Sequence, residues 1–210
     1  MNTIITKKVR LIPAPFVGTR IKIVLDDPDS LSWGMSGLLL AEGHEKAVID
    51  WGDGNTTEFA GSGILIHDYA QTGEYEVRIT DDISSITCSH LSMLSPFCTP
   101  YASMIREFTT NSVHLDTIGI CAFNKASNLQ TFHCEGSDLR SLSAFAFWTC
   151  SSLSGRIDLP HVNNVANNAF VFCPGITELH FSEADAETIT TLPGYDISFG
   201  AENASVSCDL

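Results

Sequence analysis

The sequence predicts a mostly β protein of two modules, a β-sandwich over residues 1–84 and a short repeat solenoid over residues 85–210. Three observations lead to this fold class. Apolar and polar residues alternate in the first part, as they do in half-buried strands. After about residue 83 the alternation stops, and Ser, Asn, Cys and His become more frequent. From there an Ala-Phe pair returns every 23 or 24 residues, which indicates a repeat architecture.

The first part contains clear strand patterns separated by Gly, Asp and Asn turns. The alternation is plainest in three stretches, residues 20–25, 47–51 and 75–79. Asp53 and Gly54 follow the second stretch and supply the positive-φ residues that a tight hairpin turn needs. Trp51 is expected to fill the core of the sandwich.

The second part repeats the same apolar columns. They are Phe123, Phe147 and Phe170; the small residues Ala126, Cys150 and Cys173; Leu94, Ile118, Leu142 and Val165; and Ile105, Leu129, Leu153 and Ile176. An i, i+2 apolar pair closes each unit and predicts a short strand. These pairs are Phe132 and Cys134, Ile157 and Leu159, and Leu179 and Phe181, with Phe108 and Thr110 as a weaker first copy.

A unit this short cannot bury its apolar side alone, whereas stacked units share one continuous core. We expect the Ala-Phe segments to form short helical turns behind the strands, where small residues let neighbouring units approach closely. One unit has an extra residue at or near Gly155, which predicts a β-bulge or a loop insertion. Residues 94–108 and the tail over residues 182–210 are expected to cap the two ends.

The pattern I-G-x-x-A-F-x-x-C/A-x-x-L, seen in residues 118–129, resembles the BspA-like class of leucine-rich repeats. The resemblance covers about residues 92–182, where several columns recur together. It implies a bacterial surface or secreted protein that acts in adhesion or protein binding. The resemblance brings no catalytic residues with it.

Three motifs of the first part resemble a second family. They are DWGDG at residues 50–54, HDY at residues 67–69 and GEYEV at residues 73–77. Together they are similar to the polycystic kidney disease (PKD) type of immunoglobulin-like β-sandwich. The resemblance spans roughly residues 45–80 and implies a spacer or binding module of an extracellular protein, while residues 1–44 fit as further strands.

Composition argues against several functions. Eleven Lys and Arg against 25 Asp and Glu give a net charge of −14, so the chain would repel a nucleic-acid backbone. No apolar stretch is long enough for a membrane span or a signal segment. The seven Cys form no C-x-x-C pair and are expected to be reduced and mostly buried. No known catalytic, phosphate-binding or zinc signature occurs, so neither an enzyme nor a cofactor is expected.

Aligned units place polar residues on the outward face of the strands. One column reads Glu107, Thr131, Arg156 and Glu178, and the next reads His133, Asp158 and His180. Solenoids commonly bind partners on such a face. These seven residues and Trp148 are therefore the candidate partner-binding set. The open alternatives are a solvated face, on which Arg156 and Glu178 simply pair, and a Trp148 that packs against a cap or the sandwich.

Two metal sites can be weighed against this interpretation. The column of His133, Asp158 and His180 has residue types that suit zinc, but exposed strand faces need polar residues in any case. Loop carboxylates that could suit Ca²⁺ are Asp26, Asp27, Asp29, Asp50 and Asp53. Their spacing is not that of an EF-hand, so no metal is expected at either place.

The sequence therefore predicts a non-enzymatic binding or adhesion protein that recognises a protein or glycan, as a monomer or weak dimer. The two resemblances imply a cell-surface or secreted location, although the chain shows no export signal and a cytoplasmic protein stays open. The second hypothesis is a phage or prophage structural component that uses the same modules for host attachment. A carbohydrate-active or metal-dependent enzyme is the third, and it needs a cluster of acids that the repeats do not suggest.

Overall fold

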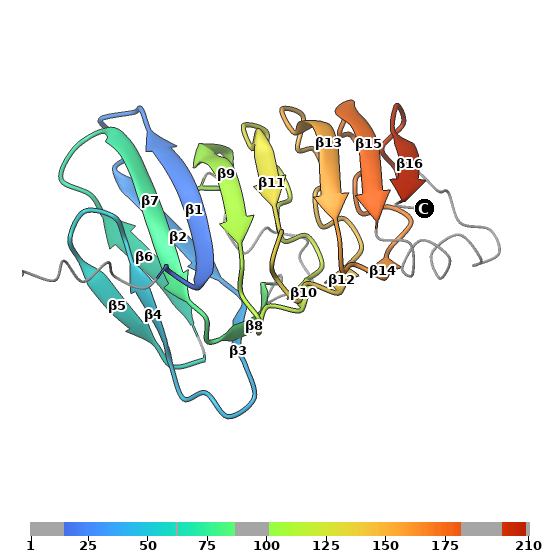
Figure 1. Ribbon diagram of the computed structural model, residues 1–210. Coiled ribbons are helices and arrows are strands. Elements are labelled where there is room, and N and C mark those ends of the chain that lie inside the picture. Colours follow the sequence, from blue (N-terminus) through green and yellow to red (C-terminus); the bar gives the residue numbers. More distant parts are fainter. Residues whose placement is uncertain (1–14, 62, 87–100, 182–198, 209–210) are drawn as a thin grey trace, which may run out of the picture.

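The computed structural model describes residues 15–61, 63–86, 101–181 and 199–208 (Figure 1). The strands of the N-terminal half are β1 (Gly18–Leu25), β2 (Ser32–Ser36), β3 (Leu38–Leu40), β4 (Ala47–Asp50), β5 (Thr56–Phe59), β6 (Ile64–Asp68), β7 (Gly73–Thr80) and β8 (Ile83–Ile86). The C-terminal half contains the 3₁₀-helix η1 (Tyr101–Met104), β9 (Ile105–Thr110), β10 (Thr117–Ile118), β11 (Thr131–His133), β12 (Ser141–Leu142), β13 (Ser154–Leu159), β14 (Asn164–Val165), β15 (Gly175–Phe181) and β16 (Ser205–Cys208). The described chain is thus mostly β.

Strands of two sheets in the N-terminal half share an apolar interior. β1, β7, β4 and β5 pair antiparallel in that spatial order, and β2 pairs antiparallel with β6. Trp33 of β2 and Trp51, which follows β4, meet edge to face with 6.3 Å between their ring centroids. Both indoles are buried. The three strand patterns predicted here are confirmed, and so is Trp51 as a core residue.

The hairpin between β4 and β5 depends on two glycines. Gly52 and Gly54 have φ of 80° and 95°. The sequence predicted positive φ at Asp53 and Gly54, so the prediction is correct for Gly54 and wrong for Asp53. A Cβ on Gly52 would lie 2.7 Å from the Glu76 carbonyl oxygen. The chain therefore needs a glycine there both for its φ and for the close approach of β7.

The C-terminal half is a solenoid whose strands follow one another along the stack (Figure 1). β9 pairs parallel with β11, and β13 pairs parallel with β15, which pairs parallel with β16. Phe108 lies opposite Phe132, and Ile157 lies opposite Leu179, as the aligned columns predicted. The pairing of β13 with β15 shifts after Gly155, which has a φ of 80°, so the predicted bulge is confirmed.

A second set of strands runs along another side of the solenoid. β8, β10, β12 and β14 pair parallel in that order. Ile118 lies opposite Leu142 on one side and Ile86 on the other. Leu94, which the sequence placed first in this column, lies outside the described residues. The neighbour of Ile118 is therefore supplied by β8 of the N-terminal half.

The Ala-Phe segments form hydrogen-bonded turns, and the prediction of short helical turns is wrong. Within one rung, the amide of Ala126 donates to the carbonyl of Phe123 at 3.0 Å. The amides of Phe123 and Lys125 instead donate to the next rung, at Ala146 (2.6 Å) and Trp148 (2.9 Å). A continuous helix would need those amides itself, so the bonds between rungs replace it.

No helix of the described residues is long and apolar enough to span a membrane.

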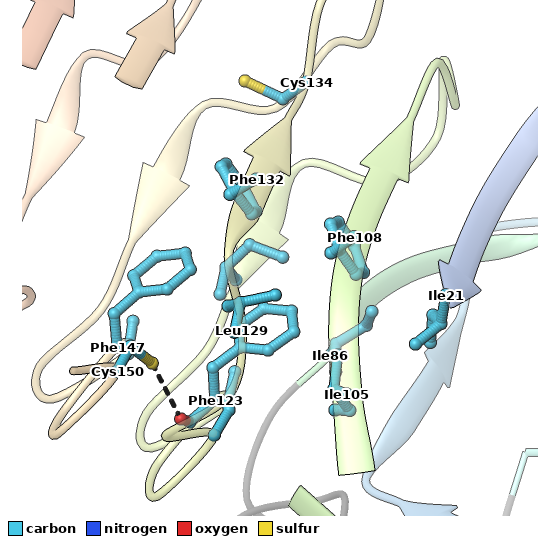
Figure 2. Packing of buried hydrophobic residues seen from close by; sticks show 14 of the residues in the cluster. Ile21, Ile86, Ile105, Phe108, Phe123, Leu129, Phe132, Cys134, Phe147 and Cys150 are labelled. Carbon is cyan, nitrogen blue, oxygen red and sulfur yellow. Dashed lines mark hydrogen bonds between the residues drawn. The ribbon is translucent and has the colours of Figure 1, made fainter. Parts of the chain in front are cut away.

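Three phenyl rings form a stack through the solenoid core, and Figure 2 shows two of them, Phe123 and Phe147. The ring of Phe147 lies between those of Phe123 and Phe170, with centroids 5.1 and 4.9 Å apart and planes within 8°. The Cys150 thiol donates to the Phe123 carbonyl at 3.2 Å, and the Cys173 thiol donates to the Phe147 carbonyl at 3.0 Å. The cysteines of the small-residue column therefore do more than allow close packing, because each thiol hydrogen-bonds its rung to the preceding one.

The cysteines whose side chains the structure describes are buried and form no disulfide. They are Cys121, Cys134, Cys150 and Cys173. Burial raises the pKa of the Cys134 thiol to about 12, and burial also raises the pKa of Cys150 well above its ordinary value. The thiols of Cys134 and Cys150 are therefore weak nucleophiles at neutral pH.

The two halves share sheets. β9 pairs antiparallel with β1, which places β9 and β11 in the same sheet as β1, β7, β4 and β5. β8 likewise belongs to the sheet of β10, β12 and β14, with β3 as its antiparallel neighbour. The boundary predicted after residue 84 falls inside β8. The division into modules stays a prediction, and backbone hydrogen bonds cross it.

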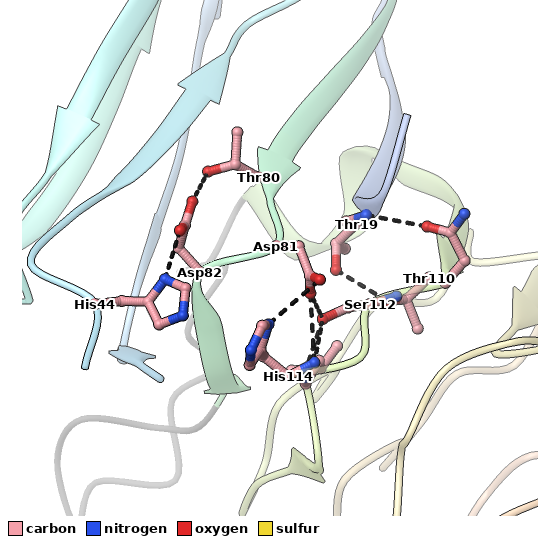
Figure 3. Close-up of polar contacts among 11 residues, drawn as sticks. Thr19, His44, Thr80, Asp81, Asp82, Thr110, Ser112 and His114 are labelled. Atoms are coloured by element: carbon pink, nitrogen blue, oxygen red, sulfur yellow. Dashed lines mark hydrogen bonds and ion pairs between the residues drawn. The ribbon is translucent and has the colours of Figure 1, made fainter. Parts of the chain in front are cut away.

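Polar side chains join loops of both halves at this junction (Figure 3). His44, in the loop before β4, has its Nδ1 2.6 Å from Oδ1 of Asp82 in the turn between β7 and β8. His114, in the loop after β9, has its Nδ1 3.3 Å from Oδ2 of Asp81. The two imidazole rings lie 4.7 Å apart between centroids. Two His–Asp contacts thus connect three loops.

The Asp82 carboxylate makes stability depend on pH. Burial alone would raise its pKa, but hydrogen bonds from Thr80 and His44 outweigh burial and lower the pKa below the usual 3.8. Such a group stabilises the fold above pH 3.8, and this contribution is lost as the pH falls through the folded-state pKa. We expect Asp82→Asn to reduce the free energy of unfolding by about 1 kcal/mol near neutral pH, and by much less in strong acid. Urea unfolding at about pH 6 and about pH 2 measures this, and equal losses would contradict it.

Candidate binding face of the solenoid strands

Two columns of polar side chains run across the outward face of neighbouring strands. The first contains Lys22 of β1, Glu107 of β9 and Thr131 of β11, then Arg156 of β13, Glu178 of β15 and Ser205 of β16. The second contains Arg20, Thr109 and His133, then Asp158, His180 and Ser207. We call these twelve residues the strand face. They include seven of the eight residues predicted from the sequence.

The N-terminal part of the strand face is organised by one ion pair. The Lys22 ammonium lies 2.7 Å from the Glu107 carboxylate, with both side chains about two-fifths exposed. The hydrogen bond to Glu107 raises the pKa of Lys22. A recess of about 100 Å³ lies beside this pair, lined by Arg20, Lys22, Glu76, Glu107 and Thr109. Solvent screens such a pair, so it adds little to the free energy of unfolding. Its main effect is to position the two side chains.

Arg156 is the centre of the C-terminal part. Its Nε lies 2.7 Å from the Asp158 carboxylate, and its terminal nitrogen lies 3.7 Å from Glu178. The pairing of Arg156 with Glu178, which the sequence left open as an alternative to partner binding, is therefore present. A recess of about 310 Å³ opens beside it, lined by Glu135, Gly136, Arg156, Asp158, Pro160, His161 and His180. The two carboxylates hold the planar guanidinium in place at the rim of a space that a ligand can enter.

His180 and Ser207 give the arrangement nearest to a catalytic group. The His180 Nδ1 lies 2.8 Å from the Ser207 hydroxyl oxygen. That hydroxyl donates to the Glu178 carboxylate, so its oxygen accepts a hydrogen bond from the imidazole. In a nucleophilic site the hydroxyl proton points at the imidazole, and the carboxylate orients the imidazole from its other nitrogen. The hydrogen bonds here run the other way and form a positioning network.

The strand face is interrupted between β11 and β13, which belong to different sheets. Across the gap, the Cys134 thiol donates to the Asp158 carbonyl at 3.3 Å. In the strand register, His133 is therefore the neighbour of Thr109, while Asp158 is the neighbour of His180. The column of His133, Asp158 and His180 is thus divided between two sheets. Across the described ranges, no group of three or more His, Cys, Asp or Glu side chains could hold a metal ion.

Trp148 lies apart from the strand face, on a turn segment. Its ring packs against Phe145 with 5.5 Å between centroids, and its backbone carbonyl accepts the hydrogen bond from Lys125. The indole Nε1 is buried and has no hydrogen-bond partner among the described residues. The eight predicted residues thus do not form one surface, because Trp148 belongs to the segment behind the strands.

The motif residues of the N-terminal half gather into a second polar and aromatic cluster. The His67 ring stacks on Trp51 at 5.0 Å and bonds the Asp53 carboxylate at 2.7 Å. The Tyr69 hydroxyl donates to the Trp51 carbonyl at 3.1 Å, and its ring lies 4.2 Å from that of Tyr75. Burial raises the pKa of Tyr69. These contacts explain why the three motifs occur together, since each supplies a partner for the others.

The strand ladders add residues that the repeat pattern did not supply. Arg20 and Lys22 come from the non-repetitive half, and Ser205 and Ser207 come from the tail. The alternation of residues 20–25 was a signal for a strand, but nothing in it indicated β9 as a neighbour. Glu135 and His161 lie in the loops that follow the strands and line the recess at Arg156.

The C-terminal half matches a known family. Residues 94–193 match the BspA type leucine rich repeat region in six copies, and the solenoid that the structure describes over residues 105–181 and 199–208 is consistent with it. This part of the chain is therefore a leucine-rich repeat region of the BspA type. Such repeats suggest a protein-binding or adhesion role in general, and the family is generally non-enzymatic. No curated protein and no solved structure matches the chain.

Proposed function

We propose that this leucine-rich repeat protein binds a protein or glycan partner through the strand face, without catalysis. The observation that carries the proposal is the recess at Arg156, where a guanidinium fixed by Asp158 and Glu178 faces a space of about 310 Å³. Arg is frequent among the residues that dominate binding energy, because its planar donors can engage a partner in several directions. These side chains lie on the outward strand face and not among the buried core residues, so a partner can reach them.

We propose further that residues 15–86 form a PKD-like immunoglobulin-like sandwich that holds the solenoid. The cluster of Trp51, Asp53, His67 and Tyr69 supports this assignment, because it unites the motifs on which the resemblance depends. β1 offers one edge to β7 and the other to β9. The sandwich thereby provides the strand that the first solenoid strand pairs with, as a cap does.

A cell-surface or secreted location and a monomeric or weakly dimeric state complete the proposal. Both fit a module that presents a mixed-charge face to a partner. Light scattering tests the oligomeric state, and a stable trimer or larger ring would contradict it. Surface labelling of intact cells that express the full-length gene tests the location.

Binding to an array of host glycans and extracellular-matrix proteins tests the function. We expect Arg156→Ala to weaken binding to the captured partner at least tenfold, as truncation of a central Arg commonly does. Arg140→Ala is the matched control, because Arg140 is also exposed and lies within 3.9 Å of a carboxylate, Asp138, but precedes β12 rather than lying on the strand face. Arg140→Ala is expected to bind like the wild type.

Trp148→Ala separates the strand face from the turn segment. If it removes binding while Arg156→Ala does not, recognition belongs to the turn segment and the proposal is wrong. Far-UV circular dichroism of each variant shows whether the fold is kept. Absence of any binding in the array would favour a role in assembly over recognition.

A further inference from the structure

A groove of about 460 Å³ crosses the turn segments of successive rungs, away from the strand face. The first two rungs each supply two residues to it, the third supplies three, and the last rung supplies Glu202. The lining consists of Lys125, Ser127, Thr149, Ser151, Phe172, Cys173, Pro174 and Glu202. Phe172 is 55% exposed, so its ring presents apolar surface to solvent.

Backbone geometry fixes the spacing of the groove residues. Lys125, Thr149 and Phe172 occupy equivalent places in their rungs, and all three have positive φ, at 64°, 63° and 62°. The amide of Lys125 donates to the next rung at 2.9 Å, and the amide of Thr149 donates to the one after at 3.0 Å. Bonded rungs lie about 4.8 Å apart, so the lining repeats at that interval. Positive φ is costly for a β-branched residue such as Thr149, and the bond from its amide to the next rung holds that conformation.

The two ends of the groove carry opposite charges. Lys125 lies at the first rung and Glu202 at the last, and both are exposed. Neither makes an ion pair with any residue that the structure describes. Between them lie the apolar surfaces of Phe172 and Pro174 and the hydroxyl groups of Thr149 and Ser151. The groove is thus positive at one end, apolar in its middle and negative at the other end.

We propose that this groove binds an extended peptide segment of about four or five residues. Three rung intervals span about 14 Å, and an extended peptide advances about 3.3 Å per residue. The segment carries a carboxylate at the Lys125 end, an apolar side chain over Phe172 and a cationic side chain at the Glu202 end. A neutral glycan could stack on Phe172 but would leave both charges without partners, so the charge pattern favours the peptide. This site is separate from the strand face.

Fluorescence anisotropy with the full chain tests the proposal. The probes are fluorescein-labelled pentapeptides with Asp at one end, Lys at the other and Leu, Val or Phe at the centre, made in both orders. One order is expected to bind better, and the affinity should fall as salt is added. Lys125→Glu and Glu202→Lys should each weaken binding of that order at least tenfold. The double variant Lys125→Glu, Glu202→Lys should instead prefer the reversed order.

Two further variants check the apolar middle and the independence of the site. Phe172→Gly removes the ring and suits the positive φ, so it should lose peptide binding while its melting temperature is kept or raised. Arg156→Ala, on the strand face, should leave peptide binding unchanged even if it abolishes partner binding on the array. The proposal is overturned if no peptide binds, if charge reversal has no effect, or if neutral oligosaccharides displace the peptide.

Discussion

Phe147→Ala is expected to reduce the free energy of unfolding by about 3 to 5 kcal/mol. The side chain is fully buried in the middle of the phenyl stack, between Phe123 and Phe170, and its ring also meets Phe132 edge to face at 4.9 Å. The substitution leaves a cavity that neither neighbour can fill, since each is held by its own rung. Urea or thermal unfolding measures the loss.

His133→Ala is the matched control for this substitution, because it removes an exposed side chain from the strand that carries Phe132. It should change the free energy of unfolding by no more than about 0.5 kcal/mol. A loss below about 1 kcal/mol for Phe147→Ala would show that the rungs do not stack in this register.

Ile21→Ala is expected to destabilise both halves together, by about 2 to 4 kcal/mol. Ile21 is fully buried in β1, where it lies opposite Val77 of β7 on one side and Phe108 of β9 on the other. Because β1 is hydrogen-bonded to strands of both halves, a cavity there weakens the sandwich and the first solenoid strands at once. Hydrogen exchange read by mass spectrometry reports the protection of each half separately.

Ile66→Ala provides the comparison, because Ile66 lies on β6 of the same half and is 57% exposed. It should leave protection in both halves nearly unchanged. If Ile21→Ala lowered protection over residues 18–80 alone, with residues 131–181 still protected, the halves would fold independently. Such a result would restore the boundary that the sequence suggests.

Much of the solenoid could be predicted, because its repeats align residues that the fold then pairs. Phe132 lies opposite Phe108 and Arg156 lies opposite Glu178, as the repeat columns require, and Gly155 marks the bulge. The Ala-Phe segments could not be assigned correctly from their pattern. Their apolar spacing fits a helical turn, but the amide partners that decide between helix and turn lie one rung away. A single unit does not contain that information.

The junction between the halves could not be predicted either. Pairing of β1 with β9 joins residues about 90 positions apart, and neither strand carries a local mark of its neighbour. The strand face was predicted where the repeats determine it, at Glu107, Thr131, Arg156 and Glu178. It was missed where other segments extend it, at Lys22 and Ser205. The groove on the turn segments could not be predicted, because exposed Lys and Thr residues in a repeat do not differ in sequence from solvated surface residues.

The alternation of amide partners in the turn segments determines how many residues such a chain can gain or lose at once during evolution. In these segments every second amide donates to the following rung and the others donate within their own rung. All of these hydrogen bonds can form only if a complete unit is duplicated. A tandem duplication of one 23- or 24-residue unit continues the phenyl stack and the thiol ladder without a break in pairing. An insertion that is not a whole number of units must bulge out as a loop, as the extra residue at Gly155 does on a small scale.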